Sequence, residues 1–181
     1  MLIRNYEKSD LEEAVAMHYC FLSKEGCYEH LRELGSKDFR GLVIADGGEI
    51  VGMCTYKVID KKYINNKYAK QVHIPNNTEE VIVLLDTMVV KQNRIKSGYG
   101  SRLHESLESL LLQEFKKVTL IAFSVIDYVT QKVNSERLAI KNGFKEIERI
   151  DDFWINSGSN DCPCCPGNCH CGAVVFIKNI G

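Results

Sequence analysis

Five cysteines crowd one short stretch of this 181-residue chain, which reads Cys162-Pro163-Cys164-Cys165-Pro166-Gly167-Asn168-Cys169-His170-Cys171. Thiolates are soft ligands, and four of them can surround a zinc ion as a tetrahedron. The spacing C-x-C-C-x₃-C-x-C differs from the paired C-x₂-C of zinc ribbons, so disulfides, a redox-active pair, free thiols and a Cu(I) site stay open beside structural zinc. The predicted metal ligands are Cys162, Cys164, Cys165, Cys169 and Cys171.

A second group with chemical potential is the turn Lys96-Ser97-Gly98-Tyr99-Gly100, here called the glycine turn, which follows an apolar strand and opens a helix. The first amides of a helix lack partners within it and carry partial positive charge, and glycine lets an anion approach them closely. Arg94, Lys96 and Arg102 add positive charge. The turn is not a P-loop, and Leu103 replaces the third glycine of a dinucleotide fingerprint. The alternative is a plain turn that needs glycine only for positive φ.

The elements that must hold these groups follow from apolar periodicity and from turn residues. Strands are predicted over residues 2–6, 41–45, 50–56, 79–90, 118–125, 144–150 and 173–177, and helices near 11–22, 28–34, 100–117 and 133–142. Antiparallel hairpin strands followed by β-α-β units predict an α/β (mixed α+β) fold, whose central sheet is mixed and mostly antiparallel with helices on both faces. We expect one domain over residues 1–181, with a Cys-rich insertion at 157–172, here called the cysteine loop.

The composition is that of an ordinary globular protein, with 45% hydrophobic residues, 26% charged residues and a net charge of −1. This balance does not favour binding to nucleic acid or to an anionic membrane surface. The longest apolar run is shorter than the roughly 18–20 residues of a membrane helix. The first residues lack the apolar segment of a signal peptide, so we expect a cytoplasmic protein.

Two segments resemble the GNAT superfamily of N-acetyltransferases. Val90 to Leu103 is similar to its acetyl-CoA motif, V-x-P-x-aromatic-[QR]-x-x-G-x-[GA]-x-x-L, with Gly98 and Gly100 on fixed positions. Ser135 to Phe144 resembles the later helix of the family, which ends in Lys and then G-F. The element order fits from residue 2 to residue 178. The resemblance implies the GNAT fold and acetyl-CoA as co-substrate.

The resemblance also implies which residues bind coenzyme A. Main-chain groups of Met88 and Val90 would hold the pantetheine arm, and the amides of Lys96 to Ser101 would hold the pyrophosphate. Ile95 occupies the [QR] position of the motif, and Arg94 would supply the missing positive charge. Asn134 lies close to the position of the family's helix asparagine. The predicted cofactor-binding residues are Met88, Val90, Arg94, Ile95, Lys96, Ser97, Gly98, Tyr99, Gly100, Ser101 and Asn134.

Acyl transfer to an amine needs a base for the amine proton and benefits from an acid for the departing thiolate. Asp86 is the predicted base, because burial in an apolar strand would raise the pKa of its carboxyl group toward the working range. The alternative is a carboxylate with structural hydrogen bonds only. Tyr128 is the predicted acid, and its alternative is an ordinary packing tyrosine. The tyrosine that often serves in the family aligns with Ala139.

The expected activity is transfer of an acetyl group from acetyl-CoA to a primary amine of a small molecule, peptide or protein. The alternative is a non-catalytic CoA-binding module of the same fold, whose cysteine loop senses metal or redox state. The expected partner is the amine acceptor, with no nucleic acid and no membrane, and a homodimer is an option. Segments 20–40, 60–78 and 150–171 are the loops expected to select the acceptor.

Overall fold

The computed structural model describes residues 1–21, 27–60, 62–64, 72–73, 75, 78, 81–133, 135–157, 162, 165 and 168–181. Among these residues, seven strands form one sheet in the order β1-β2-β3-β4-β5-β7-β6. The strands are β1 (Leu2–Asn5), β2 (Phe39–Asp46), β3 (Glu49–Ile59), β4 (Ile82–Val90), β5 (Val118–Ile126), β6 (Lys145–Ile150) and β7 (Gly172–Ile180). Neighbouring strands pair antiparallel except β4 and β5, which pair parallel. The predicted mixed, mostly antiparallel sheet is confirmed.

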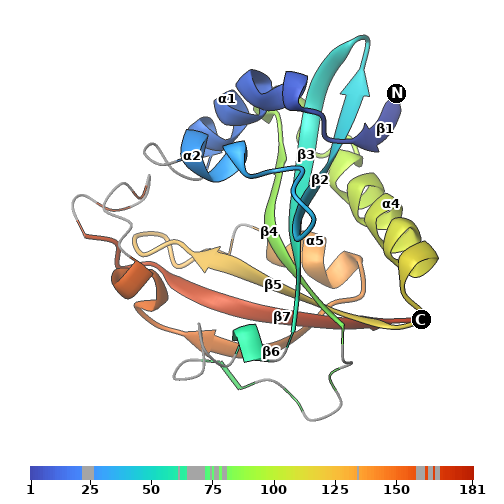
Figure 1. Cartoon of the computed structure of the whole chain (residues 1–181). Coiled ribbons are helices and arrows are strands. Elements are labelled where there is room, and N and C mark those ends of the chain that lie inside the picture. Colours follow the sequence, from blue (N-terminus) through green and yellow to red (C-terminus); the bar gives the residue numbers. More distant parts are fainter. Residues whose placement is uncertain are drawn as a thin grey trace.

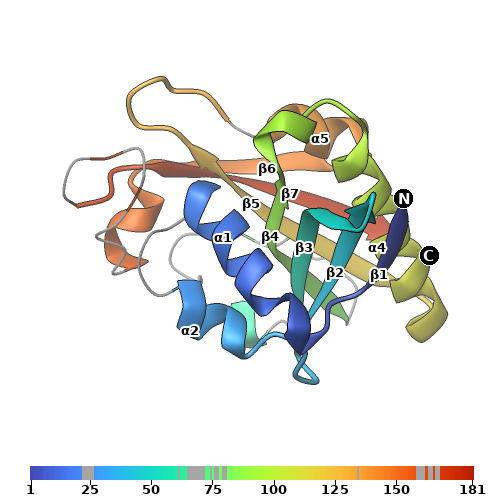
Figure 2. The same cartoon turned by 90° about the horizontal axis from the view of Figure 1, so that it is seen from above.

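The helices cover both faces of this sheet (Figures 1 and 2). Leucines of α4 (Tyr99–Glu114) and Ala139 of α5 (Glu136–Lys141) pack on one face, here called the α4 face. The other face, the α1 face, is covered by α1 (Leu11–Phe21) and α2 (Cys27–Arg32). Short 3₁₀ turns η1 (Lys8–Asp10), η2 (Gln92–Arg94) and η3 (Phe153–Ser157) and a short helical segment at 62–64 complete the described elements. Among the described residues, no helix has the length and apolarity to span a bilayer.

Element boundaries differ from the sequence prediction where local contacts override periodicity. The helix predicted from Val133 begins at Glu136, because Val133 forms a β-bridge with Ile126. The helix predicted to reach Lys117 ends at Glu114, because Phe115 is already extended. The strand predicted over 173–177 is longer, since β7 pairs with both β5 and β6. Residues 79–80 and much of 60–78 lie outside the described residues.

Strand β4 contains one extra residue opposite β3. Leu85 pairs with Tyr56 and Thr87 pairs with Thr55, so Asp86 between them has no partner on β3. Such a β-bulge bends a strand and re-aims its side chains. The pairing of β4 with β5 also ends at Leu85, and beyond it the two strands diverge (Figure 1). Asp86 therefore marks the point where the centre of the sheet opens.

Candidate functional site

The open edge of β4 begins at the bulge. The Lys91 N–H donates to the Val51 carbonyl of β3 at 2.9 Å. Because successive residues of a strand point their main-chain groups to opposite sides, those of Val90 and Met88 face away from β3. No described strand pairs with this edge beyond Leu85. The main-chain groups of Met88 and Val90 are therefore placed to bond a ligand lying between β4 and β5.

The glycine turn follows β4 and η2 and opens α4. Gly98 is the residue before the helix, with φ of +84°, and a side chain built there would meet nothing within 4 Å. The first amide to bond back into the helix is that of Arg102, which donates to the Gly98 carbonyl at 3.1 Å. The amides before it are the ones a helix start leaves unsatisfied. Gly98 thus has the positive φ that the plain-turn alternative requires, and it also leaves an open surface over these amides.

One amide of the predicted pyrophosphate site, which spans Lys96 to Ser101, and the amide just before that site already have partners. The Ile95 N–H donates to the Gln92 carbonyl and the Ser97 N–H to the Arg94 carbonyl, both at 3.4 Å. The Ile95 side chain is 53% exposed, so it contributes neither charge nor an enclosed surface. The stretch from Gly98 to Ser101 is better placed to hold an anion than the residues before it.

Gly100 serves a different purpose from Gly98. A Cβ at this position would lie 3.1 Å from a methyl group of Leu138 on α5, which is closer than ordinary van der Waals contact. The absence of a side chain therefore lets the first turn of α4 pack closely on α5. Sequence reasoning assigned both glycines to the ligand, but only Gly98 faces open space.

Charged side chains surround and anchor the turn. The Tyr99 hydroxyl donates to Asp46 at 2.7 Å, and this bond holds the pKa of the Asp46 carboxyl group below its usual value. Lys91 pairs with Glu13 at 2.9 Å and with Glu49 at 2.7 Å, which ties the end of β4 to α1 and to the β2–β3 hairpin. Arg94 is different, since its Nε is buried and has no hydrogen-bond partner among the described residues. An unpaired guanidinium N–H beside an open helix start suits an anionic ligand.

Asp86 lies at the centre of a polar cluster on the α1 face. Its Oδ2 accepts a hydrogen bond from Thr55 at 3.0 Å and lies 2.8 Å from Nε2 of His30, while its Oδ1 lies 3.6 Å from Nζ of Lys57. Burial acts to raise the pKa of Asp86, but the hydrogen bond and charge of His30, the charge of Lys57 and the Thr55 hydroxyl outweigh it and lower that pKa to about 2. The prediction that the pKa of Asp86 is raised toward the working range is therefore wrong. At neutral pH the carboxyl group is ionised.

The charge of Asp86 fixes the orientation of His30. An ionised carboxylate only accepts hydrogen bonds, so Nε2 of His30 carries the shared proton. In the neutral imidazole, Nδ1 then has the free lone pair. The ring packs against Phe39, with 4.9 Å between centroids, and its side chain is 33% exposed. Sequence reasoning missed His30, because it lies 56 residues from Asp86 and no local pattern links them.

The predicted acid, Tyr128, lies in the connection between β5 and α5. Its side chain is 52% exposed, and its ring lies 5.5 Å from that of His170 in the cysteine loop. Asn134 lies outside the described residues. Next to it, Ser135 shares a short 2.5 Å hydrogen bond with the buried Ser124 of β5, a pair that sequence reasoning did not identify.

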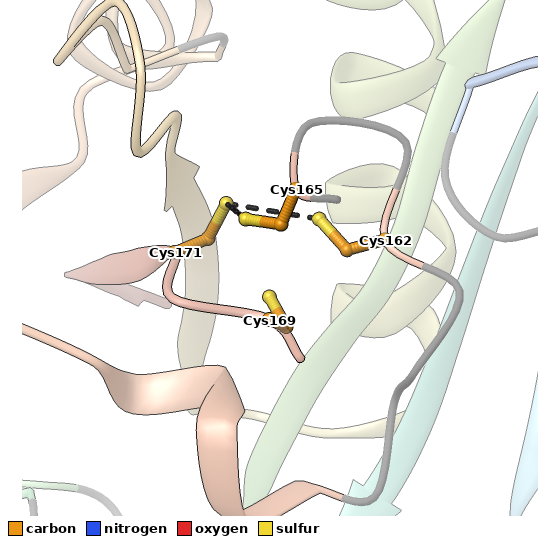
Figure 3. A group of neighbouring side chains, drawn as sticks. All are labelled: Cys162, Cys165, Cys169 and Cys171. Atoms are coloured by element: carbon orange, nitrogen blue, oxygen red, sulfur yellow. Dashed lines mark hydrogen bonds between the residues drawn. The ribbon is translucent and has the colours of Figure 1, made fainter. Parts of the chain in front are cut away.

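The cysteine loop brings four sulfur atoms together, those of Cys162, Cys165, Cys169 and Cys171 (Figure 3). Cys164, the fifth predicted ligand, lies outside the described residues. Burial raises the pKa of the Cys171 thiol, and burial likewise raises that of Cys169, to about 11. Without a metal these groups are protonated thiols, which are poor nucleophiles.

Two surface hollows lie apart from these groups. The larger, of about 420 Å³, lies between the first two strands and α4 and is lined by Arg4, Leu42 and Glu105 among others. The second, of about 330 Å³, adjoins it near Tyr6 and Tyr56. Neither is lined by Asp86, His30 or the glycine turn, so both hollows are separate from the candidate site.

No protein-family model and no curated protein sequence matches this chain. Among solved structures, Arabidopsis thaliana NAA60 in complex with acetyl-CoA is similar with a TM-score of 0.73 and 16% identity, over 99% of this chain and 98% of that chain. The ribosomal-protein-S18-alanine N-acetyltransferase from Escherichia coli gives 0.66 and 13%, over 99% and 94%. The aminoglycoside 6'-N-acetyltransferase from Enterococcus faecium gives 0.64 and 15%, over 99% and 97%. The likeness extends over nearly the whole of this chain.

Proposed function

We infer the function of this chain from its GNAT fold, which its sequence resemblance implied. We propose that it transfers the acetyl group of acetyl-CoA directly to a primary amine of a small molecule, peptide or protein. The observation that carries this proposal is the opening between β4 and β5 at Asp86, which has a free main-chain edge and the glycine turn at its end. The complex of NAA60 with acetyl-CoA, which has the same fold, supports the choice of ligand.

Coenzyme A has a natural path along these groups. The pyrophosphate would lie on the amides from Gly98 to Ser101, beside the unpaired Nε of Arg94. The pantetheine arm would extend along the edge of β4 and bond the main-chain groups of Met88 and Val90. The thioester would then arrive near the bulge, where the two strands diverge. Lys96 would add positive charge at the mouth of this path.

The acceptor amine would approach from the α1 face, where His30 and Asp86 meet. The amine nitrogen attacks the thioester carbonyl, forming the C–N bond while the C–S bond breaks. In our proposal the amine proton passes to Nδ1 of His30. Asp86 orients the ring and stabilises the imidazolium, so it acts as a positioning residue in place of the predicted base. The CoA thiolate leaves and is protonated by Tyr128 or by water.

The test is turnover of acetyl-CoA with a panel of amines, including aminoglycosides, polyamines and peptides with free N-termini. Products are detected by mass spectrometry, because thiol reagents would also react with the protein's own eight cysteines. We expect amine-dependent formation of N-acetyl product. A complete lack of product across the panel, in protein that still binds acetyl-CoA by calorimetry, would favour the non-catalytic alternative.

Matched histidine variants test the proposed base. We expect His30→Gln to lower kcat/KM for the amine by about 10²–10⁴, the range for general base catalysis, and to leave acetyl-CoA affinity unchanged. The control is His73→Gln, since the His73 side chain is exposed and its main-chain N–H bonds Glu148. Equal activity in the two variants would exclude His30 as the base without affecting the proposed reaction.

A further inference from the structure

The sulfur atoms of Cys162, Cys165, Cys169 and Cys171 all lie within 4.8 Å of one another (Figure 3). The Cys171 sulfur lies 3.7 Å from that of Cys162 and 3.6 Å from that of Cys165. Sulfur atoms at the corners of a tetrahedron around zinc, each about 2.3 Å from the metal, lie about 3.8 Å apart. A disulfide would need about 2.05 Å. We propose that these four cysteines hold one zinc ion as a tetrathiolate site, independent of the acetyltransferase reaction.

The elements around the cluster would hold it rigidly. Cys169 and Cys171 are buried and directly precede β7, which pairs with β5 on one side and β6 on the other. The Trp154 N–H of η3 donates to the Cys171 carbonyl at 3.2 Å. A Cβ at Gly172 would lie 2.7 Å from the Ile150 carbonyl, so the chain leaves the cluster in close contact with the end of β6. Two of the four ligands are therefore fixed by the sheet itself.

The groups next to the sulfurs are those that support metal-bound thiolates. The His170 N–H donates to the Cys165 sulfur at 3.4 Å. Main-chain N–H groups aimed at ligand sulfurs are a common outer layer of thiolate sites. The His170 imidazole points elsewhere, since its Nδ1 lies 3.3 Å from Asp152. The imidazole is thus occupied away from the sulfurs, which leaves four thiolates as the ligand set.

Four sulfur ligands in this arrangement select among metals. A tetrahedral set of four thiolates is typical of zinc or iron. Thiolates also bind Cu(I), but this tetrahedral arrangement does not indicate Cu(I). Zinc needs no redox partner, and a structural site closed by four ligands leaves no position for substrate. Its role would be to fold the cysteine loop onto β7 and the connection that bears Tyr128, because the loop has few apolar residues of its own.

The first experiment measures metal in protein purified without chelator, by inductively coupled plasma mass spectrometry. We expect about one equivalent of zinc per chain. Cys165→Ser and Cys169→Ser are expected to reduce it to well under half an equivalent. The matched control is Cys164→Ser, which changes the neighbouring cysteine and is expected to keep its zinc. Loss of zinc from Cys164→Ser with retention in Cys165→Ser would overturn the ligand set, and iron in place of zinc would overturn the metal.

A second measurement does not depend on whether a variant folds. Trp154 is the single tryptophan of the chain, and its main-chain N–H donates a hydrogen bond to the Cys171 carbonyl, so its fluorescence reports on the cluster. We expect removal of zinc from the wild-type protein by a strong chelator to shift this emission, and re-addition of zinc to reverse the shift. Co(II) in place of zinc is expected to give the visible absorption of a tetrahedral thiolate complex. An intact-mass spectrum that shows disulfides among these cysteines in freshly purified protein would overturn the proposal.

Discussion

The contacts of Asp86 predict how the stability of the protein depends on pH. The pKa of this carboxyl group is lowered from 3.8 to about 2 in the folded state. Each pKa unit corresponds to about 1.4 kcal/mol, so the ionised carboxylate contributes roughly 2 kcal/mol to the free energy of unfolding. Because the folded pKa is the lower one, this contribution is fully present above about pH 4 and is lost as pH falls toward 2.

The substitution Asp86→Asn removes the charge and keeps the shape. At about pH 7 we expect the variant to be less stable than wild type by about 2 kcal/mol, because His30 and Lys57 lose the negative charge beside them. The gap should close as pH falls from about 4 toward 2, since wild-type Asp86 then becomes neutral as well. Urea denaturation followed by circular dichroism at several pH values measures the stability difference between variant and wild type and its change with pH. Other acid-sensitive groups are the same in both proteins, so their contributions cancel in this difference.

A matched carboxylate separates this effect from a general loss of charge. Asp46 also accepts a hydrogen bond, from Tyr99, but it lies at the surface, so Asp46→Asn is expected to change stability much less at every pH. A gap between Asp86→Asn and wild type that does not change with pH would refute the electrostatic reasoning. So would a variant that is as stable as wild type at neutral pH, because the desolvation cost of the buried charge would then equal the gain from its partners.

Four further predictions concern single positions. Gly98→Ala should cost about 1–2 kcal/mol, because φ there is +84°, and should weaken acetyl-CoA binding measured by calorimetry. Gly100→Ala should lower stability by crowding Leu138, and adding Leu138→Ala should recover part of the loss in a double-mutant cycle by denaturation. Tyr128→Phe should lower kcat but not acetyl-CoA affinity if the hydroxyl protonates the thiolate, and an unchanged kcat would leave it a packing residue. Burial raises the pKa of Cys54 to about 12, so this thiol should react with a chromogenic disulfide reagent only after denaturation.

The fold was largely predictable because its signals are local. The hairpin of β2 and β3, the apolar strand before the glycine turn and the helix after it can each be recognised in a short window of sequence. The positive φ of Gly98 was also predictable, since glycine is the residue that adopts it most easily. Helix ends were less accurate, because Val133 is held by a bridge to Ile126, and periodicity does not report such contacts.

The site was predictable only in part, because its key contacts join distant segments. Asp86 stood out as a charge in an apolar strand, but the low pKa depends on His30 and Lys57, which come from α2 and β3. The bulge at Asp86 depends on the pairing register of β4 with β3, and neither composition nor periodicity reports that register. The purpose of Gly100 likewise depends on Leu138, a residue of another helix.

The bulge at Asp86 also places the two halves of β4 out of phase. Before it, Val83 and Leu85 face α4, and after it Met88 faces α4 while Val89 faces α1. If the same residues, Asp86 included, formed a regular strand, Val89 would face α4 and the opposite main-chain groups would line the open edge. Deleting Asp86 would instead restore regular alternation and leave Met88 toward α4 and Val89 toward α1, so both cores and the ligand edge would keep their phase while the carboxylate is lost. The extra residue therefore adds a carboxylate at the opening between β4 and β5 without changing which side chains of this strand each core receives.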